Sequence, residues 1–155
     1  KKGNLYFHFA SKDELGRSLI REAGERYFEY LAKSVTSDDP LGKIMDVLNA
    51  VLAYHRRRGF VGGCIFGNTA LEMGDSDRDF AALEREVFDR WERVLAGYLG
   101  AAARTGKLPA GIKPAPMARH IVAVMEGSIM MARLHKREEP IAECIGYLKK
   151  LLGIK

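Results

Sequence analysis

The feature that most constrains the fold of this chain is the spacing of its apolar residues, which recur every three or four positions along most of its length. This spacing places apolar side chains on one face of an α-helix, whereas a half-buried strand would alternate apolar and polar residues. Runs that alternate in this way are nearly absent. The sequence therefore predicts an all-α fold. Between residues 11 and 34, for example, the apolar positions are Leu15, Leu19, Ala23, Tyr27 and Leu31.

Helix-starting and helix-ending residues divide the chain into six predicted helices. Ser, Asp and Pro residues mark the starts, because their side chains cap a first turn or fit its backbone, and glycines mark most of the ends. A Pro- and Gly-containing loop at 107–114 precedes the most apolar helix. The predicted helices cover about 11–34, 39–58, 64–73, 77–105, 116–136 and 140–152.

Composition bounds the classes of function. Of the 155 residues, 47% are hydrophobic and 29% are charged, which is typical of an ordered globular protein. The formal charge of +5 permits an anionic partner without proving one. No apolar run is long enough to cross a bilayer. Two cysteines are too few for a disulfide framework, and we expect reduced thiols and a cytoplasmic location.

Catalytic and metal-binding patterns are not found in the sequence. The histidines do not have the spacing of a metal site on one helix, and the glycines do not follow a strand as those of a phosphate-binding loop do. No Ser-His-Asp motif can be identified. We therefore expect a protein that is not an enzyme and that needs no metal and no cofactor.

The most specific motif is KGNLYFHFASKDEL at residues 2–15. It resembles the end of the TetR-family helix-turn-helix, where a short recognition helix with a Gly-x-Leu-Tyr-x-His-Phe pattern precedes the helix that joins the DNA-binding head to the body. The resemblance implies contacts with double-stranded DNA. Base edges would be read by the surface of Lys2, Gly3, Asn4 and Phe7, and phosphates would be held by Tyr6, His8 and Lys12.

The resemblance also implies two domains and a mode of assembly. Residues 1–36 would be the remnant of the DNA-binding domain with its connecting helix, and residues 37–155 a ligand-binding and dimerisation domain. The first two helices of the family's helix-turn-helix are not in this sequence, so either they belong to a longer protein or the chain is a truncated form. In the family, the last two long helices pair with their copies across a two-fold axis.

Polar and aromatic residues on the middle helices predict an effector pocket. Each of them alone is more often an ordinary core or surface residue than a ligand contact, and that interpretation stays open. The stretch 63–68 with Glu72, and the Glu126-Gly127 step, also resemble recurrent parts of the family's regulatory domain. The predicted ligand-binding residues are Tyr54, His55, Phe66, Asn68, Glu72, Met73, Phe88, Trp91, His120, Met125 and Glu126.

The helix predicted at 116–136 has more apolar surface than one small core requires. Its charged residues Arg119, Glu126 and Arg133 lie seven apart on one narrow stripe. We expect a homodimer that covers the remaining surface together with the last helix. The predicted interface residues are Ile121, Val124, Ser128, Ile129, Ala132, Ile141, Ile145 and Leu148.

Together these features predict a DNA-binding transcriptional regulator that responds to a small molecule. It would be a repressor released from a palindromic operator by its effector. The alternative is a helical small-molecule-binding dimer without a DNA-binding role. An intact helix-turn-helix segment upstream of residue 1 would favour the regulator.

Overall fold

The computed structural model describes residue 9 and residues 11–154, and this part of the chain contains helices and no strands. The prediction of an all-α fold is confirmed. The helices are α2 (Lys12–Ser34), α3 (Pro40–Arg57), α4 (Ile65–Met73), α5 (Arg78–Arg104), α6 (Pro114–His135) and α7 (Glu139–Leu151).

The capping side chains fix the helix starts where the sequence predicts them. The Ser11 hydroxyl accepts a hydrogen bond from the backbone N–H of Glu14 at 3.1 Å. The Asp39 carboxylate accepts one from the N–H of Gly42 at 2.9 Å. These bonds satisfy backbone donors that a first helical turn leaves without a partner. The largest difference from the predicted bounds is at α6, which begins at Pro114, two residues before the expected Pro116.

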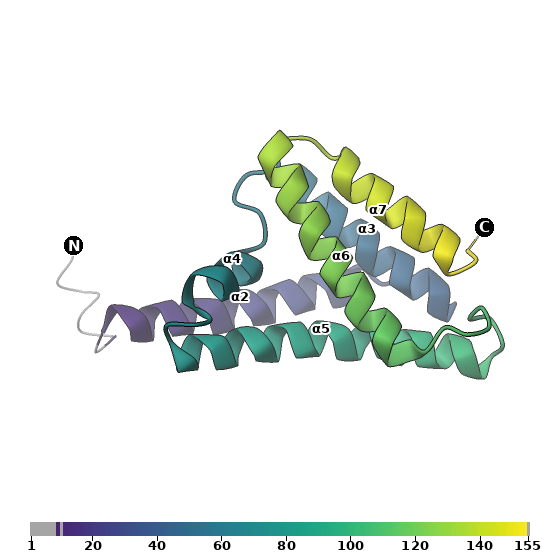
Figure 1. Cartoon of the computed structure of the whole chain (residues 1–155), viewed down its shortest axis with the longest axis horizontal. Helices are drawn as coiled ribbons and strands as arrows, with labels where there is room; N and C mark the ends of the chain where they lie inside the picture. The colour runs from purple at the N-terminus through teal and green to yellow at the C-terminus, as the bar shows by residue number, and fades with distance from the viewer. Residues whose placement is uncertain (1–8, 10, 155) are drawn as a thin grey trace.

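The long helix α5 lies along the lower side of the molecule in Figure 1 and packs against α2, α3, α4 and α6. The helix α6 crosses over α5, and α7 packs on α6 and α3. The side chains of the main core come from α2, α3, α5, α6 and α7, and those of Leu48, Leu95 and Ile121 have no solvent exposure. Burying each such side chain contributes about 1.5–3 kcal/mol to folding.

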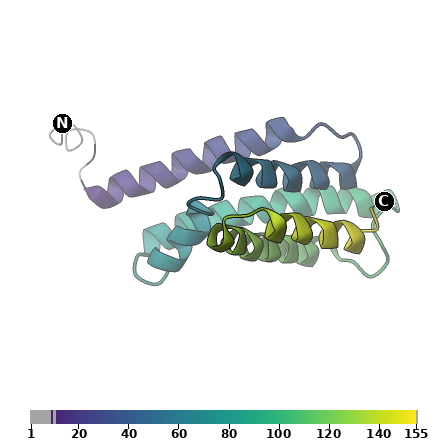
Figure 2. The same ribbon diagram turned by 90° about the horizontal axis from the view of Figure 1, so that it is seen from above.

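A smaller apolar cluster lies at the other end of the molecule, where α2, α4 and α5 meet. It contains Ile20, Phe66, Phe80 and Leu83. The N-terminal end of α2 projects past the other helices, as the view from above shows (Figure 2). The N-terminal half of α2 rests on the small cluster through Ile20.

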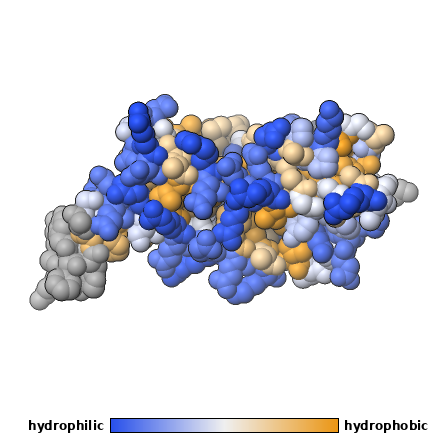
Figure 3. All heavy atoms as spheres, turned by 90° about the horizontal axis from the view of Figure 1, so that it is seen from below, coloured by the Kyte–Doolittle hydropathy of each residue, from blue (hydrophilic) through white to orange (hydrophobic). Residues whose placement is uncertain are grey.

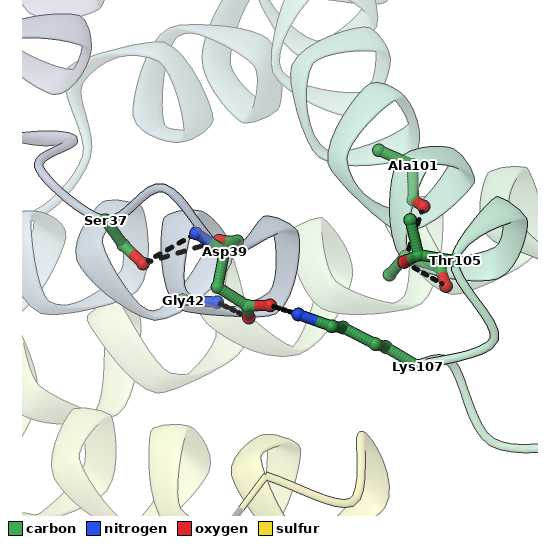
Figure 4. Close-up of polar contacts among 7 residues, drawn as sticks. Ser37, Asp39, Gly42, Ala101, Thr105 and Lys107 are labelled. Atoms are coloured by element: carbon green, nitrogen blue, oxygen red, sulfur yellow. Dashed lines mark hydrogen bonds and ion pairs between the residues drawn. The ribbon is translucent and has the colours of Figure 1, made fainter.

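A polar contact closes the opposite end of the bundle. The ammonium of Lys107, in the loop after α5, pairs with the Asp39 carboxylate that also caps α3 (Figure 4). The Thr105 hydroxyl bonds back to the carbonyl oxygen of Ala101 at 3.1 Å. These contacts fix the loop 107–113 against the start of α3.

The face formed by α2 and α5 is mostly hydrophilic, with small apolar patches between the charged side chains (Figure 3). Within the described residues, no helix has the length and apolar character needed to span a membrane. The larger exposed apolar side chains of α6 and α7 are Met130, Met131, Leu134, Tyr147 and Leu151.

Candidate ligand-binding site

Two adjoining cavities lie around the start of α4. The first has a volume of about 370 Å³ and lies between α2, α3 and the loop that leads into α4. The second, of about 310 Å³, lies between α4, α5 and α6. Gly63, Cys64 and Asn68 line both of them. Cavities of this size accommodate small organic ligands.

Aromatic rings wall the first cavity and the space behind it. The ring of Tyr27, on α2, lies 5.5 Å from that of Tyr54 and 5.9 Å from that of Phe66, between ring centroids. The ring of Trp91, on α5, stands perpendicular to Tyr27 with centroids 6.5 Å apart. Phe88, one turn before Trp91, lines the second cavity. These rings give the site rigid apolar walls.

Buried polar atoms without a hydrogen-bond partner lie in or close to the lining of these cavities. Glu84, on α5, is 3% exposed, and neither of its carboxylate oxygens has a hydrogen-bond partner in the described part of the chain. The same holds for Oε1 of Glu126, on α6, and for Nε1 of Trp91. Buried polar groups in proteins are nearly always hydrogen-bonded, so each of these exceptions requires an explanation.

Burial changes the acid–base chemistry of the site. Burial and, to a smaller extent, the nearby charge of Glu126 together raise the pKa of Glu84 to about 7. The pKa of Glu126 is raised by burial and lowered by a hydrogen bond with the Cys64 thiol. The pKa of Cys64 is raised by burial and by the charge of Glu126, so the thiol is neutral and a poor nucleophile at neutral pH. Burial and the charge of Arg58 lower the pKa of His55 to about 4.

The loop between α3 and α4 shapes both cavities, and four of its residues have positive φ. Gly59, Phe60, Gly62 and Gly63 have φ of 60°, 57°, 86° and 66°. Two contacts fix this loop to α4 and α6. The amide of Asn68 donates to the Gly62 carbonyl oxygen at 2.7 Å and accepts from the Arg133 guanidinium at 2.8 Å.

Two adjacent glycines of this loop are expected to respond differently to alanine. At Gly62 a Cβ would meet no atom within 4 Å, so the cost is the backbone strain of positive φ, about 1–2 kcal/mol. At Gly63 a Cβ would also lie 2.9 Å from Cδ of Arg133. Urea unfolding should therefore show a larger loss for Gly63→Ala than for Gly62→Ala. Equal losses would mean that Arg133 moves aside without cost.

The structure brings together most of the predicted ligand-binding residues, though not all. Tyr54, His55, Phe66 and Asn68 line the first cavity, and Asn68, Phe88 and Glu126 line the second. Trp91 packs behind them against Tyr27. The remaining four are elsewhere: Glu72 and His120 are exposed, Met73 packs on the small apolar cluster, and Met125 is fully buried in the main core.

Three residues of the site were not predicted from the sequence: Tyr27 and Cys64, which line the cavities, and Glu84, which is buried near Glu126. Tyr27 lies on the apolar stripe of the helix that the sequence assigns to connect two domains, and the sequence indicates Cys64 only as a reduced thiol. Glu84 carried a signal that could have been used. It falls four residues after Phe80 and seven before Trp91, so it shares the buried face of α5.

The predicted DNA contacts can be placed only in part. Lys2, Gly3, Asn4, Tyr6, Phe7 and His8 lie outside the described residues. Lys12 is exposed in the first turn of α2, directly after the capping residue Ser11.

The predicted interface residues need correction, because most of them face the core of their own chain. Ile121, Ser128, Ile129, Ala132, Ile141, Ile145 and Leu148 are at most 8% exposed in the single chain, and Val124 is half-buried. A residue that its own core covers cannot contact a second copy. The surface that α6 and α7 leave open is the opposite one. It contains Ala123, Gly127, Met130, Met131, Leu134, Gly146, Tyr147 and Leu151.

No group of three His, Cys, Asp or Glu side chains within residues 11–154 is arranged to hold a metal ion. The two cysteines, Cys64 and Cys144, are both free thiols.

Comparison with known proteins places the chain among transcriptional regulators. The sequence profile of the family described as "Tetracyclin repressor-like, C-terminal domain" matches residues 40–148. The transcriptional regulator AcuR of Cereibacter sphaeroides is 32% identical over 143 residues, which are 90% of this chain and 65% of AcuR. The chain thus spans about two thirds of the length of that relative. The HTH-type transcriptional repressor DhaR of a Mycobacterium species is 20% identical over 146 residues, which are 90% of this chain and 70% of DhaR.

A solved structure supports the same assignment. The crystal structure of a regulatory protein TetR from Rhodobacter sphaeroides superposes with a TM-score of 0.90 at 27% identity, and the match covers 97% of this chain and 81% of that one. All three relatives are described as regulators or repressors. Since the family profile covers more than half of the chain, and the fold and the sequence relatives agree with it, the chain belongs to the TetR family of transcriptional regulators.

Proposed function

We propose that this chain is the effector-binding and dimerising part of a ligand-responsive transcriptional repressor. The observation that carries the proposal is the position of the first cavity. Ala23 and Tyr27 of α2 line it, and α2 is the helix that leads to the motif at residues 2–9. A ligand in this cavity would touch the connecting helix directly. The description of DhaR as a repressor favours repression over activation.

The proposed division of labour follows the chain. Residues 1–36 carry the DNA-contacting motif and the connecting helix, and residues 37–155 carry the ligand site and the dimer surface. Lys2, Gly3, Asn4 and Phe7 would read bases of a palindromic operator, while Tyr6, His8 and Lys12 would hold phosphates. We propose a cytoplasmic location, where the DNA is.

The proposed mechanism is a shift between two arrangements of the dimer. One arrangement sets the two DNA-binding heads at the spacing of successive operator half-sites, and the other does not. An effector that binds the second arrangement more tightly displaces the protein from DNA. The contact between ligand and Tyr27 would transmit the change, because α2 joins the cavity wall to the head.

The proposed dimer uses the surface that α6 and α7 leave exposed. Leu134 and Tyr147 are each 71% exposed, which is unfavourable for large apolar side chains on a monomer. A Cβ at Gly127 or Gly146 would meet no atom of the chain within 4 Å, so the fold of one chain does not require glycine there. Small residues at both positions permit close approach of a second copy. Gly127 and Met130 also line the second cavity, which links the ligand site to this surface.

The experiment that tests the function uses the longest natural protein that contains this chain. DNA sites are selected from random duplexes by binding, and release is then measured with candidate small molecules. Two-fold symmetric sites and ligand-dependent release are expected. Tight ligand binding without affinity for any selected DNA would instead favour a ligand-binding dimer with no DNA-binding role.

In the same protein, Lys12→Ala should weaken binding to all DNA sequences alike. One lost phosphate contact should make the slope of log K against log[salt] less steep by about 0.9. The matched control is Lys33→Ala, at the far end of α2, where the ammonium pairs with Glu29 at 2.6 Å. Unchanged affinity and slope in Lys12→Ala would remove Lys12 from the proposed contacts.

A further inference from the structure

Two acidic side chains with no basic partner lie at the ligand site, namely Glu126 at the wall of the second cavity and the buried Glu84 near it. Glu84 comes from α5 and Glu126 from α6, and the two lie close enough for the charge of Glu126 to raise the pKa of Glu84. None of the ion pairs between described residues includes either of them. Three of their four carboxylate oxygens are buried without a hydrogen-bond partner in that same part of the chain.

Such a pair destabilises a folded protein. Removing a carboxylate from water is unfavourable unless a positive charge or hydrogen-bond donors replace the water, and two neighbouring carboxylates also repel each other. A second group on the same face of α5, the indole N–H of Trp91, is likewise buried without a partner. Orphan groups that gather beside a cavity, and not at scattered positions, indicate a site whose remaining partner is a ligand.

We infer that the effector is a small organic cation, namely a protonated primary or secondary amine attached to an apolar or aromatic body. This inference rests on the proposed function and names the chemical class of its ligand. The amine binds the Glu126 carboxylate at the wall of the second cavity, on the side toward Glu84, and the apolar body lies against the aromatic rings.

The hydrogen-bond donors of the proposed ligand match the acceptors of the site. A protonated primary amine has three N–H donors, and three carboxylate oxygens lack a donor. A quaternary ammonium has none and would leave these oxygens unsatisfied. The rings of Tyr27, Phe66 and Phe88 offer apolar contact, and an aromatic face also attracts a cation. The N–H of Trp91 can donate to an acceptor on the ligand.

The basic residues near the cavities do not offer the same match to an anion. Arg133 is already bonded to the Asn68 side chain at 2.8 Å. Arg58 is exposed, and its guanidinium lies 5.4 Å from the centroid of the Tyr54 ring. Both arginines are exposed, whereas the unpaired oxygens of Glu84 and Glu126 are buried. An anionic ligand would have to approach Glu126 with its charge opposed.

The test uses the only tryptophan of the chain as its reporter, because Trp91 packs against Tyr27, which lines the first cavity. Four probes of similar size are titrated into the 155-residue chain at pH 7.5 while Trp91 fluorescence is recorded. They are phenethylamine, 2-phenylethanol, phenylacetate and phenethyltrimethylammonium. Phenethylamine should bind at least tenfold more tightly than each of the other three. Tightest binding by phenylacetate or 2-phenylethanol, or no response to phenethylamine up to 10 mM, overturns the inference.

Two conservative variants locate the binding. Glu126→Gln and Glu84→Gln keep the side-chain shape and remove the charge, so each should weaken phenethylamine binding at least tenfold and leave 2-phenylethanol binding within twofold. Glu72→Gln, an exposed glutamate of α4, is the matched control and should bind as the unmodified chain does. Circular dichroism of all three variants checks that they are folded. Unchanged phenethylamine affinity in Glu126→Gln assigns the cation to another place and contradicts the inference.

The test of the cation site is independent of the test of the proposed function, because amine binding is measured on the chain without DNA. Selective amine binding with no effect on DNA in the longest natural protein would contradict the ligand-responsive repressor and leave the cation site standing. Release of DNA by neutral or anionic ligands, with no amine binding, would contradict the cation site alone.

Discussion

Arginine at position 123 is expected to yield a folded monomer, whereas arginine at position 121 should prevent folding. The two positions lie two residues apart on α6, which turns the side chains about 200° from each other. Ile121 has no exposed surface in the single chain, while Ala123 is exposed in the middle of the proposed dimer surface. The same substitution thus tests which face of α6 packs on its own core.

The physical reasons differ for the two variants. Ile121→Arg would bury an unpaired charge, which costs several kcal/mol out of a total stability of about 5–15 kcal/mol. Ala123→Arg leaves the core untouched but places two like charges near the two-fold axis, one from each copy. The dimer dissociation constant should rise by about 100-fold or more, while the helical circular dichroism signal stays that of the unmodified chain.

Sedimentation velocity at about 10 µM measures the result. The control is Ala82→Arg, which makes the same change at an exposed position of α5 and should remain dimeric. A dimeric Ala123→Arg would place the dimer surface elsewhere. A monomer for the unmodified chain would remove the proposed dimer altogether.

The second large effect concerns Glu84, whose replacement by Gln should stabilise the protein at pH 8. The pKa of Glu84 is about 7 in the folded protein, against an ordinary value of 4.5. The folded state therefore holds the proton more tightly. The stabilisation from this proton is complete below pH 4.5 and is lost as the pH rises to 7. A shift of this size corresponds to about 3 kcal/mol.

Glutamine at position 84 is neutral at every pH and does not lose this stabilisation. We expect Glu84→Gln to match the unmodified chain near pH 4.5 and to exceed its melting temperature at pH 8 by on the order of 10 °C. His55 requires the comparison to be made between variants. Its pKa is lowered to about 4, so its contribution is complete above pH 6.5 and is lost as the pH falls toward 4. The two trends oppose each other in the unmodified chain.

Thermal unfolding from pH 4.5 to pH 8 measures the difference between the two proteins. The control is Glu86→Gln, an exposed glutamate two residues further along α5, which should change the melting temperature little at any pH. A constant difference between Glu84→Gln and the unmodified chain across this range would mean that the Glu84 carboxylate is not destabilised by burial. The variant with the higher melting temperature at pH 8 should also bind the amine more weakly. The charge of Glu84 destabilises the protein alone but favours binding of the proposed cation.

Local signals in the sequence determined the helices of this protein. Capping depends on residues within one turn, so Ser11 and Asp39 marked the starts of α2 and α3 correctly. Glycine at positive φ likewise marked the end of α3 and the loop before α4. Each of these choices is made by groups a few residues apart, which a sequence displays directly. The motif at residues 2–15 and the order of the helices were also enough to indicate the TetR family.

Only the tertiary structure decided which face of each helix meets which neighbour. The helix α6 is apolar around most of its circumference, and periodicity alone does not say which side meets the core of its own chain. Two residues predicted for the interface, Ile121 and Ser128, therefore face the core of their own chain in the structure. The ligand site also depends on how the helices pack. Its residues Tyr27, Glu84 and Glu126 come from three helices and lie up to 99 positions apart in the sequence. Their meeting depends on how α2, α5 and α6 cross, which packing of whole helices settles and no local signal encodes.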